Sequence, residues 1–177
     1  SALVLGENLF YGHDFAAALQ TIDEIGDADA LYAAVADAFD GAQVAVQISA
    51  DGRFEVTMQQ PGMLRPLRTA ELSDGTLRFL IWAVALLTPR PPPLMVLNEP
   101  ETSLHPDLLP ALGALIARAS RETQLIVVSH ATRLVAAIED AAPADACQRV
   151  EREKSLGGTV TQCHGACDAP QWHWPEC

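Results

Sequence analysis

The stretch LMVLNEPETSLHP, residues 94–106, joins a short apolar run to a polar turn. Its first residues form a continuous apolar run of the kind found in a strand that is buried on both faces of a parallel sheet. Asn98 and Glu99 follow at the carboxyl end of that strand, which is where open α/β sheets bind their ligands. The stretch therefore predicts an α/β fold with a polar site at the tip of an interior strand.

The residues downstream extend the same pattern. Residues 105–120 predict a helix, QLIVVSH at 124–130 predicts a second buried strand, and residues 132–141 predict a further helix. A strand, a helix and a strand in this order imply a right-handed βαβ crossover between two parallel strands. Buried parallel strands with flanking helices are therefore expected at the centre of the fold.

A long apolar helix is expected upstream of the central stretch. Ser73 precedes the run DGTLRFLIWAVALL at residues 74–87, and its hydroxyl can cap the first free backbone NH groups of a helix. The run is apolar on nearly all sides, so the helix should be buried. The segment TPRPPP at 88–93 then ends it.

The two ends of the chain have different patterns. Residues 14–40 have the apolar spacing of two short amphipathic helices that are separated near Gly26. QVAVQIS at 43–49 and RFEVTMQ at 53–59 alternate apolar and polar residues, which predicts a small antiparallel hairpin. Beyond Pro143 the chain is polar and is expected to be irregular.

A chain of 177 residues can bury one sizeable core and is too short for two ordinary domains. We expect a single, partial domain. Its segments are 1–69, a helical segment and hairpin; 70–142, the α/β core; and 143–177, an irregular tail that contains the cysteines and two of the tryptophans.

Composition and charge limit the possible functions. The formal net charge of −12 opposes a broad phosphate-neutralising surface, so any DNA contact should be local. The longest strongly apolar run, residues 79–87, is too short to cross a bilayer, and we expect no membrane span. The N-terminus lacks the basic flank of a secretory signal and a starting Met, which favours a trimmed chain. All cysteines lie near the C-terminus and cannot form a framework for the fold, so a reducing cytoplasm is expected.

Three segments occur in an order that resembles a known family. They are LSDGT at 72–76, LMVLNEPETSLHP at 94–106 and VVSH at 127–130. Together they resemble ABC-type ATPases of the RecF/SMC-like kind, in which the acidic motif continues as EPE and then LHP. The resemblance covers roughly residues 70–140, whereas residues 1–69 and the tail match only loosely. It implies the C-terminal half of an ATPase head that uses ATP and Mg²⁺ and forms a head-to-tail homodimer.

The first segment corresponds to the signature loop of that family. Ser73, Asp74, Gly75 and Thr76 lie at the expected start of a helix, whose free NH groups and dipole favour an anion. The resemblance implies that this loop reaches the γ-phosphate of ATP held by the partner, with Ser73 and Gly75 as contacts. The alternative is a plain helix cap.

The second segment corresponds to the Walker B motif and the D-loop. The resemblance implies that Glu99 is the general base that polarises the attacking water. Asn98 stands where most relatives have an Asp that helps to hold magnesium, and its amide can order metal-bound water without adding a charge. Ser103 and His105 occupy the D-loop that links the two sites of the dimer. The structural alternative is a strand that ends in a Glu-Pro turn before a capped helix.

The third segment ends at His130, which resembles the switch histidine that hydrogen-bonds the γ-phosphate. One imidazole nitrogen must donate for that role. A histidine at a strand end with no catalytic role is the alternative.

The family's phosphate-binding loop is absent from the sequence. Such a loop needs a Gly-rich backbone followed by Gly-Lys-Ser/Thr, but Lys154 is the only lysine and follows Glu153. The resemblance places that loop, and the residues that hold adenine, in an N-terminal half. We expect this half to be the main partner, and the chain alone to bind ATP weakly or not at all. Whether that half was lost in evolution or removed from a longer chain stays open.

Two other functions remain possible at this point. The first is a degenerate ABC-like module that has lost hydrolysis and acts through protein contacts. The second is a small zinc-binding regulator, because the tail contains thiol and imidazole groups at Cys163, Cys167, His173 and Cys177. The CxxxC spacing lacks the second matched pair of a structural zinc site.

Overall fold

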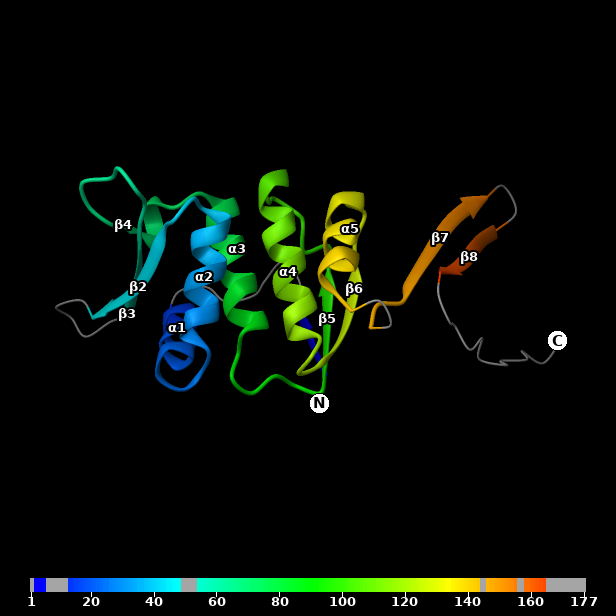
Figure 1. The fold of residues 1–177 in the computed structure, drawn as a ribbon, viewed down its shortest axis with the longest axis horizontal. Coiled ribbons are helices and arrows are strands. Elements are labelled where there is room, and N and C mark those ends of the chain that lie inside the picture. The colour runs from blue at the N-terminus through cyan, green and yellow to red at the C-terminus, as the bar shows by residue number, and fades with distance from the viewer. Residues whose placement is uncertain (1, 6–12, 49–53, 144–145, 156–157, 165–177) are drawn as a thin grey trace. The chain divides into compact units, whose positions relative to one another are not determined.

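The structure is a computed structural model that describes residues 2–5, 13–48, 54–143, 146–155 and 158–164. It forms two compact units, residues 1–141 and 142–177 (Figure 1). The first unit contains the helices, a three-stranded parallel sheet and a small antiparallel sheet. No helix among the described residues is long and apolar enough to span a membrane.

The two short helices that were expected within residues 14–40 are present in the first unit. Helix α1 spans His13–Ile25 and α2 spans Ala28–Ala38. Asp27 separates them and caps α2, because its carboxylate accepts a 2.9 Å hydrogen bond from the NH of Ala30. The apolar stripes of both helices are buried in the main core; they consist of Phe15, Leu19, Ile22, Leu31 and Val35.

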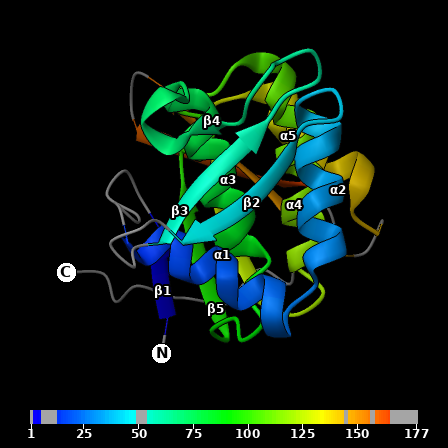
Figure 2. The ribbon, with the colours of Figure 1, turned by 90° about the vertical axis from the view of Figure 1, so that its left-hand side faces the viewer.

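The expected hairpin is present as well. Strand β2 (Gln43–Ile48) pairs antiparallel with β3 (Phe54–Gln59), and a short β4 (Leu67–Arg68) extends the sheet on the other side of β3. Val44, Val56 and Met58 are buried, so one face of this sheet belongs to the core. Figure 2 shows the sheet in front of α3 and beside α1 and α2.

Helix α3 (Asp74–Leu86) is the buried helix that the apolar run predicts. The short 3-10 turn η1 (Thr69–Glu71) precedes it. The Ser73 hydroxyl caps α3 by accepting a 3.1 Å hydrogen bond from the NH of Thr76. The ring of Phe79 is fully buried and meets that of Phe39 edge-on at 5.3 Å between centroids.

The parallel sheet has the strand order β1-β5-β6. Strand β5 (Leu94–Asn98) lies in the centre, between β1 (Ala2–Leu5) and β6 (Gln124–Val128). The chain passes from β5 to β6 through the 3-10 turn η2 (Pro106–Leu108) and helix α4 (Leu109–Ala119), and α5 (Thr132–Ala141) follows β6. The parallel strands and the flanking helices that were expected are therefore confirmed.

Strand β6 differs from the prediction of a second buried strand. Leu125 and Val127 pack against the core, but Ile126 and Val128 on the opposite face are 46% and 44% exposed. The reason is that helices cover only one face of this strand within the described part of the chain. The apolar run in the sequence reports the residue types of the strand but not which of its faces is covered.

The C-terminal unit also differs from expectation. Strands β7 (Arg149–Ser155) and β8 (Gly158–His164) form an antiparallel hairpin where an irregular tail was predicted. Arg149–Ser155 consists mostly of charged residues and has no apolar alternation that would mark a strand. Cys167, His173 and Cys177, the remaining residues of the suggested zinc site, lie outside the described residues.

Helices α4 and α5 approach closely at Gly113, which yields a stability prediction. A Cβ at this position would lie 2.6 Å from the Cβ of Ala137 and 2.9 Å from its carbonyl carbon. Gly113→Val should therefore lower the free energy of unfolding by about 1–3 kcal/mol, the usual cost of overpacking. Urea unfolding measures this change in the free energy of unfolding.

The matched control for this prediction is Ala114→Val, which adds the same side chain at an exposed position of the same helix. That variant should unfold within about 0.5 kcal/mol of the parent, as is usual for surface changes. Equal effects of the two substitutions would show that the close approach of α4 and α5 does not require glycine.

Candidate functional site

The candidate site begins where strand β5 ends. Asn98 is its last residue and is exposed, and the NH of Glu99 continues the sheet by donating a 2.7 Å hydrogen bond to the carbonyl of Val128. Glu99 then adopts a left-handed backbone with φ +47°, which is uncommon for a non-glycine residue. This turn directs the chain away from the sheet, and the Glu99 side chain is 46% exposed. Such strained residues are concentrated at functional sites.

His130 lies beside Glu99. Its Nε2 is 3.4 Å from Oε1 of Glu99, and its side chain is 84% exposed. The two residues follow neighbouring parallel strands, whose carboxyl ends meet at the same edge of the sheet. A carboxylate and an imidazole therefore face solvent together and are accessible to a ligand.

A second carboxylate, that of Glu101, joins the same two loops from inside. Its Oε1 accepts hydrogen bonds from the Ser129 hydroxyl (2.7 Å), the His130 NH (2.8 Å) and the Ala131 NH (3.2 Å). Its Oε2 is buried without a hydrogen-bond partner among the described residues. Burial raises the pKa of the Glu101 carboxyl, but the hydrogen bonds from Ser129, its own backbone, His130 and Ala131 outweigh burial and leave the pKa below its usual value.

The sequence predictions did not include Glu101. Its partners are 28 to 30 residues away, so no local spacing connects them. The available signal was topological: residues that follow adjacent parallel strands come together at one sheet edge, and Glu101 follows β5 as Ser129 follows β6.

The LSDGT segment lies at the N-terminus of α3, as predicted. Ser73 caps the helix, and its hydroxyl is also 2.8 Å from that of Thr76. Asp74 is exposed in the first turn. A Cβ at Gly75 would lie 3.0 Å from the carbonyl oxygen of Ser103, so the helix start and the loop after β5 approach closely at this glycine. Ser103 also has a left-handed backbone, with φ +63°.

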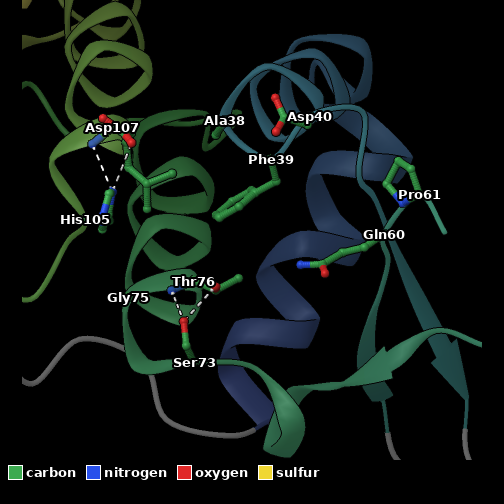
Figure 3. Close-up of a pocket in the computed structure, with 11 residues that line it drawn as sticks. Ala38, Phe39, Asp40, Gln60, Pro61, Ser73, Gly75, Thr76, His105 and Asp107 are labelled. Carbon is green, nitrogen blue, oxygen red and sulfur yellow. Dashed lines mark hydrogen bonds and ion pairs between the residues drawn. The ribbon is translucent and has the colours of Figure 1, made fainter. Parts of the chain in front are cut away.

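A cavity of about 520 Å³ opens in front of this helix start (Figure 3). Ser73, Gly75 and Thr76 line it together with His105 and Asp107. The remaining lining residues come from the end of α2, the turn after β3 and η2; they are Ala38, Phe39, Asp40, Gln60, Pro61 and Leu108.

His105 and Asp107 are linked to each other at the edge of this cavity. The Asp107 NH donates a 3.3 Å hydrogen bond to Nδ1 of His105, and that nitrogen is 3.4 Å from the Asp107 carboxylate. Arg133 reaches the same carboxylate at 3.4 Å. These side chains are all more than half exposed, so the ion pair between Arg133 and Asp107 is screened by water and weak.

The predicted residues thus form two groups. Glu99 and His130 meet at the ends of β5 and β6, while Ser73, Gly75, Thr76 and His105 line the cavity. The contact between Gly75 and Ser103 connects the loop of the first group to the helix of the second. The sequence therefore identified residues that the fold brings together across the unit.

The oxygen donors at the strand end fit part of a magnesium site. Asn98 and Glu99 provide an amide and a carboxylate oxygen next to each other, and Mg²⁺ prefers oxygen ligands with several waters retained. No group of three or more His, Cys, Asp or Glu side chains in the described ranges is arranged to hold a metal. Phosphate oxygens and water would have to complete the coordination.

A family model described as "AAA domain, putative AbiEii toxin, Type IV TA system" matches residues 7–136. No curated protein matches the chain. Solved structures show a clear likeness to heads of SMC proteins. One is an SMC head bound to the C-winged helix domain of ScpA, with a TM-score of 0.62 and 17% identity over 84% of this chain and 44% of that one.

Two further structures agree. The first comes from work on ATP-driven dimerization and DNA-stimulated activation of SMC ATPases; its TM-score is 0.60 at 15% identity, over 85% of this chain and 89% of that one. The second is the SMC head domain from Thermotoga maritima. Its TM-score is 0.56 at 17% identity, over 92% of this chain and 53% of that one. The chain thus spans about half of two of these relatives and most of the third. It has the fold of an SMC-like, ABC-type ATPase head, as the resemblance implied.

Proposed function

This chain belongs to the AAA domain family described as a putative AbiEii toxin of a type IV TA system, and on that premise we propose that it is the C-terminal half of an ATPase head. In this proposal the head binds and hydrolyses ATP with Glu99 as the general base. The observation that carries the proposal is the exposed pair of Glu99 and His130, 3.4 Å apart at the carboxyl ends of adjacent parallel strands.

The chemistry assigned to these side chains is a hydrolysis. Water attacks the γ-phosphorus in line, its proton passes to the Glu99 carboxylate, and the bond to the leaving ADP oxygen breaks. His130 donates a hydrogen bond from its ring to the γ-phosphate, and Asn98 orders water near it. A bound Mg²⁺ would neutralise part of the phosphate charge.

The second group of residues would act on a nucleotide held by another copy. The start of α3 lines the cavity with Ser73, Gly75 and Thr76, and the first backbone NH groups of a helix have no partner within the helix. Helix N-termini favour anions, and a side chain at Gly75 would crowd the carbonyl oxygen of Ser103, 3.0 Å from its Cβ. We assign this loop to the γ-phosphate in a head-to-tail homodimer, with Asp74, Ser103 and His105 at the same interface.

The phosphate-binding loop would come from an N-terminal half. Its place is suggested by β6, which pairs with β5 on one side and has no strand on the other among the described residues. The exposed face of β6 carries Ile126 and Val128, apolar side chains that a neighbouring segment would cover. Because hydrolysis needs the cellular ATP pool, we place the protein in the cytoplasm. The charge of −12 does not favour DNA as a partner.

A degenerate module that works only through protein contacts is the second candidate. Asn98 favours it, because an amide adds no negative charge to the metal site. The decisive difference is Glu99-dependent turnover, which only an ATPase has.

The experiment for the proposed dimer uses the full-length protein, meaning this chain joined to its natural upstream half. Ser73→Arg should weaken ATP-dependent dimerisation, measured by light scattering after gel filtration, because a long side chain at the helix cap blocks the cavity. We expect the apparent dimer affinity to fall at least about 10-fold, equivalent to 1.4 kcal/mol. Thr76 would also lose its cap, so a conservative variant is needed.

Ser73→Asp is that variant. Aspartate caps helices as well as serine does and thus preserves α3, but it brings a negative charge to the place assigned to phosphate. It should therefore dimerise as poorly as Ser73→Arg. Normal ATP-dependent dimerisation of both variants would refute the assignment of this loop.

A further inference from the structure

We propose that Glu101 is the positioning residue that holds His130 beside Glu99, an inference that rests on the proposed function. Glu101 does not line the cavity, and it contacts His130 at the backbone NH. It would act on the reaction only through the placement of His130.

Three hydrogen-bond donors meet at one atom of Glu101. Oε1 of Glu101 accepts from Ser129, His130 and Ala131, which are consecutive residues of the loop after β6. The Ser129 hydroxyl accepts in turn from the Ala131 NH at 3.0 Å. The backbone that carries the imidazole therefore cannot rotate without breaking several hydrogen bonds to the same carboxylate.

The loop that carries His130 continues directly into helix α5. The carbonyl of Ala131 accepts from the NH groups of Leu134 and Val135 and so starts α5. Leu134 is fully buried. The carboxylate of Glu101 thus joins the His130 loop to a helix that is anchored in the core.

The contact between Glu99 and His130 is too weak to fix the positions of these two side chains. The Glu99 and His130 side chains are 46% and 84% exposed, and ion pairs between exposed groups are weak and screened by salt. By contrast, hydrogen bonds to a charged, half-buried acceptor are strong. The network around Glu101 is therefore the stronger of the two connections between the loops.

The short loop after β5 presents the carboxylates of Glu99 and Glu101 in different directions. The left-handed backbone of Glu99 and the buried Pro100 separate them, so that Glu99 faces solvent while Glu101 faces the β6 loop. The carbonyl of Glu99 accepts from Thr102, and that of Glu101 accepts from Leu104. These bonds fix the turn on which both carboxylates sit.

The charge of Glu101 is also suited to this role. The pKa of its carboxyl lies below the usual value, because the hydrogen bonds outweigh the effect of burial. It is therefore ionised at neutral pH and accepts without having to lose a proton first. Glutamine in its place would keep an oxygen acceptor of the same reach, whereas leucine would keep only the volume.

The test combines hydrogen exchange with ATP turnover. In Glu101→Leu, the amides of His130 and Ala131 should exchange at least about 10-fold faster, because both lose their acceptor. Glu101→Gln should retain most of the protection, and the exposed Glu122→Gln serves as the matched control with no change. The exchange is measured on the chain alone and on the full-length protein.

The turnover measurement separates positioning from a general structural role. Glu101→Leu should lower kcat about 10- to 100-fold with KM for ATP changed less than about 3-fold, since misplacement of a reacting group has effects of this size. Glu101→Gln should recover most of the lost rate. Adding Glu101→Leu to His130→Ala should have little further effect on kcat, because both changes remove the same contribution.

Three results would overturn the inference. They are unchanged exchange at His130 and Ala131 in Glu101→Leu, faster exchange with an unchanged kcat, and full additivity with His130→Ala. The proposed function has its own criterion: if Glu99→Gln leaves turnover intact, the site is not an ATPase site, and the exchange rates alone then decide whether Glu101 holds the loop.

Discussion

Glu99→Gln is expected to lower the ATP turnover of the full-length protein by about 10²–10⁴-fold, the contribution that a general base usually makes. The substitution keeps the size and one oxygen of the side chain but removes the group that accepts a proton from water. The Glu99 side chain is 46% exposed and therefore accessible to water, and His130 lies 3.4 Å from it. A steady-state phosphate-release assay at neutral pH measures the effect.

The control for this result is nucleotide binding. Glu99→Gln should bind ATP within about 3-fold of the parent, because the lost interaction belongs to the transition state and not to the bound substrate. Glu122→Gln, at an exposed position in the loop between α4 and β6, should hydrolyse ATP normally. Wild-type turnover in Glu99→Gln would favour the degenerate module over the ATPase.

Phe79→Ala is expected to lower the free energy of unfolding by about 3–5 kcal/mol, the range observed for buried aromatic residues. Phe79 is fully buried in α3, and its ring contacts Phe39, which lines the cavity. The same helix has Ser73 at its N-terminus, so the packing of Phe79 helps to orient the proposed signature loop. Urea unfolding followed by circular dichroism measures the change.

Phe79→Leu is the companion variant. It keeps much of the apolar volume and loses mainly the edge-on ring contact, so its cost should be clearly smaller, about 1–2 kcal/mol. If both variants unfold at the same denaturant concentration as the parent, Phe79 does not contribute to the core in the way that its burial indicates.

Much of the fold could be predicted because local chemistry determines it. The serine before residues 74–87 caps a helix in the structure as the sequence predicts, and the Pro-rich segment ends it. The hairpin of β2 and β3 follows from strict alternation, and the pairing of β5 with β6 follows from the order strand, helix, strand. Each of these features depends on neighbours in the sequence or on a strong topological rule.

Two errors concern strands. The exposure of Ile126 and Val128 depends on which elements cover β6, and an apolar run cannot report this. The C-terminal hairpin was missed because Arg149–Ser155 contains mostly charged residues, so no apolar face marks it. The first error depends on tertiary contacts, whereas the second concerns a local hairpin that its charged sequence does not reveal.

The candidate site also contains residues that the motifs predicted and one that they did not. Glu99, His130 and Ser73 were identified through motifs, and the fold places the first two 3.4 Å apart. Glu101 lies within one of those motifs, yet its partners follow a different strand. Only the three-dimensional arrangement shows that one oxygen of this carboxylate accepts several hydrogen bonds from the loop that carries His130.

Mixing two inactive variants tests whether Glu99 acts on a nucleotide that the signature loop of another copy completes. One full-length protein carries Glu99→Gln and the other Ser73→Arg. In a head-to-tail dimer of the two, one site has both an intact Glu99 and an intact Ser73, so an equimolar mixture should recover turnover. Random pairing would give about one quarter of the wild-type rate, which is the upper value because Ser73→Arg also weakens dimerisation. A mixture that is no more active than either variant alone would show that Glu99 of one copy and Ser73 of another do not share a site.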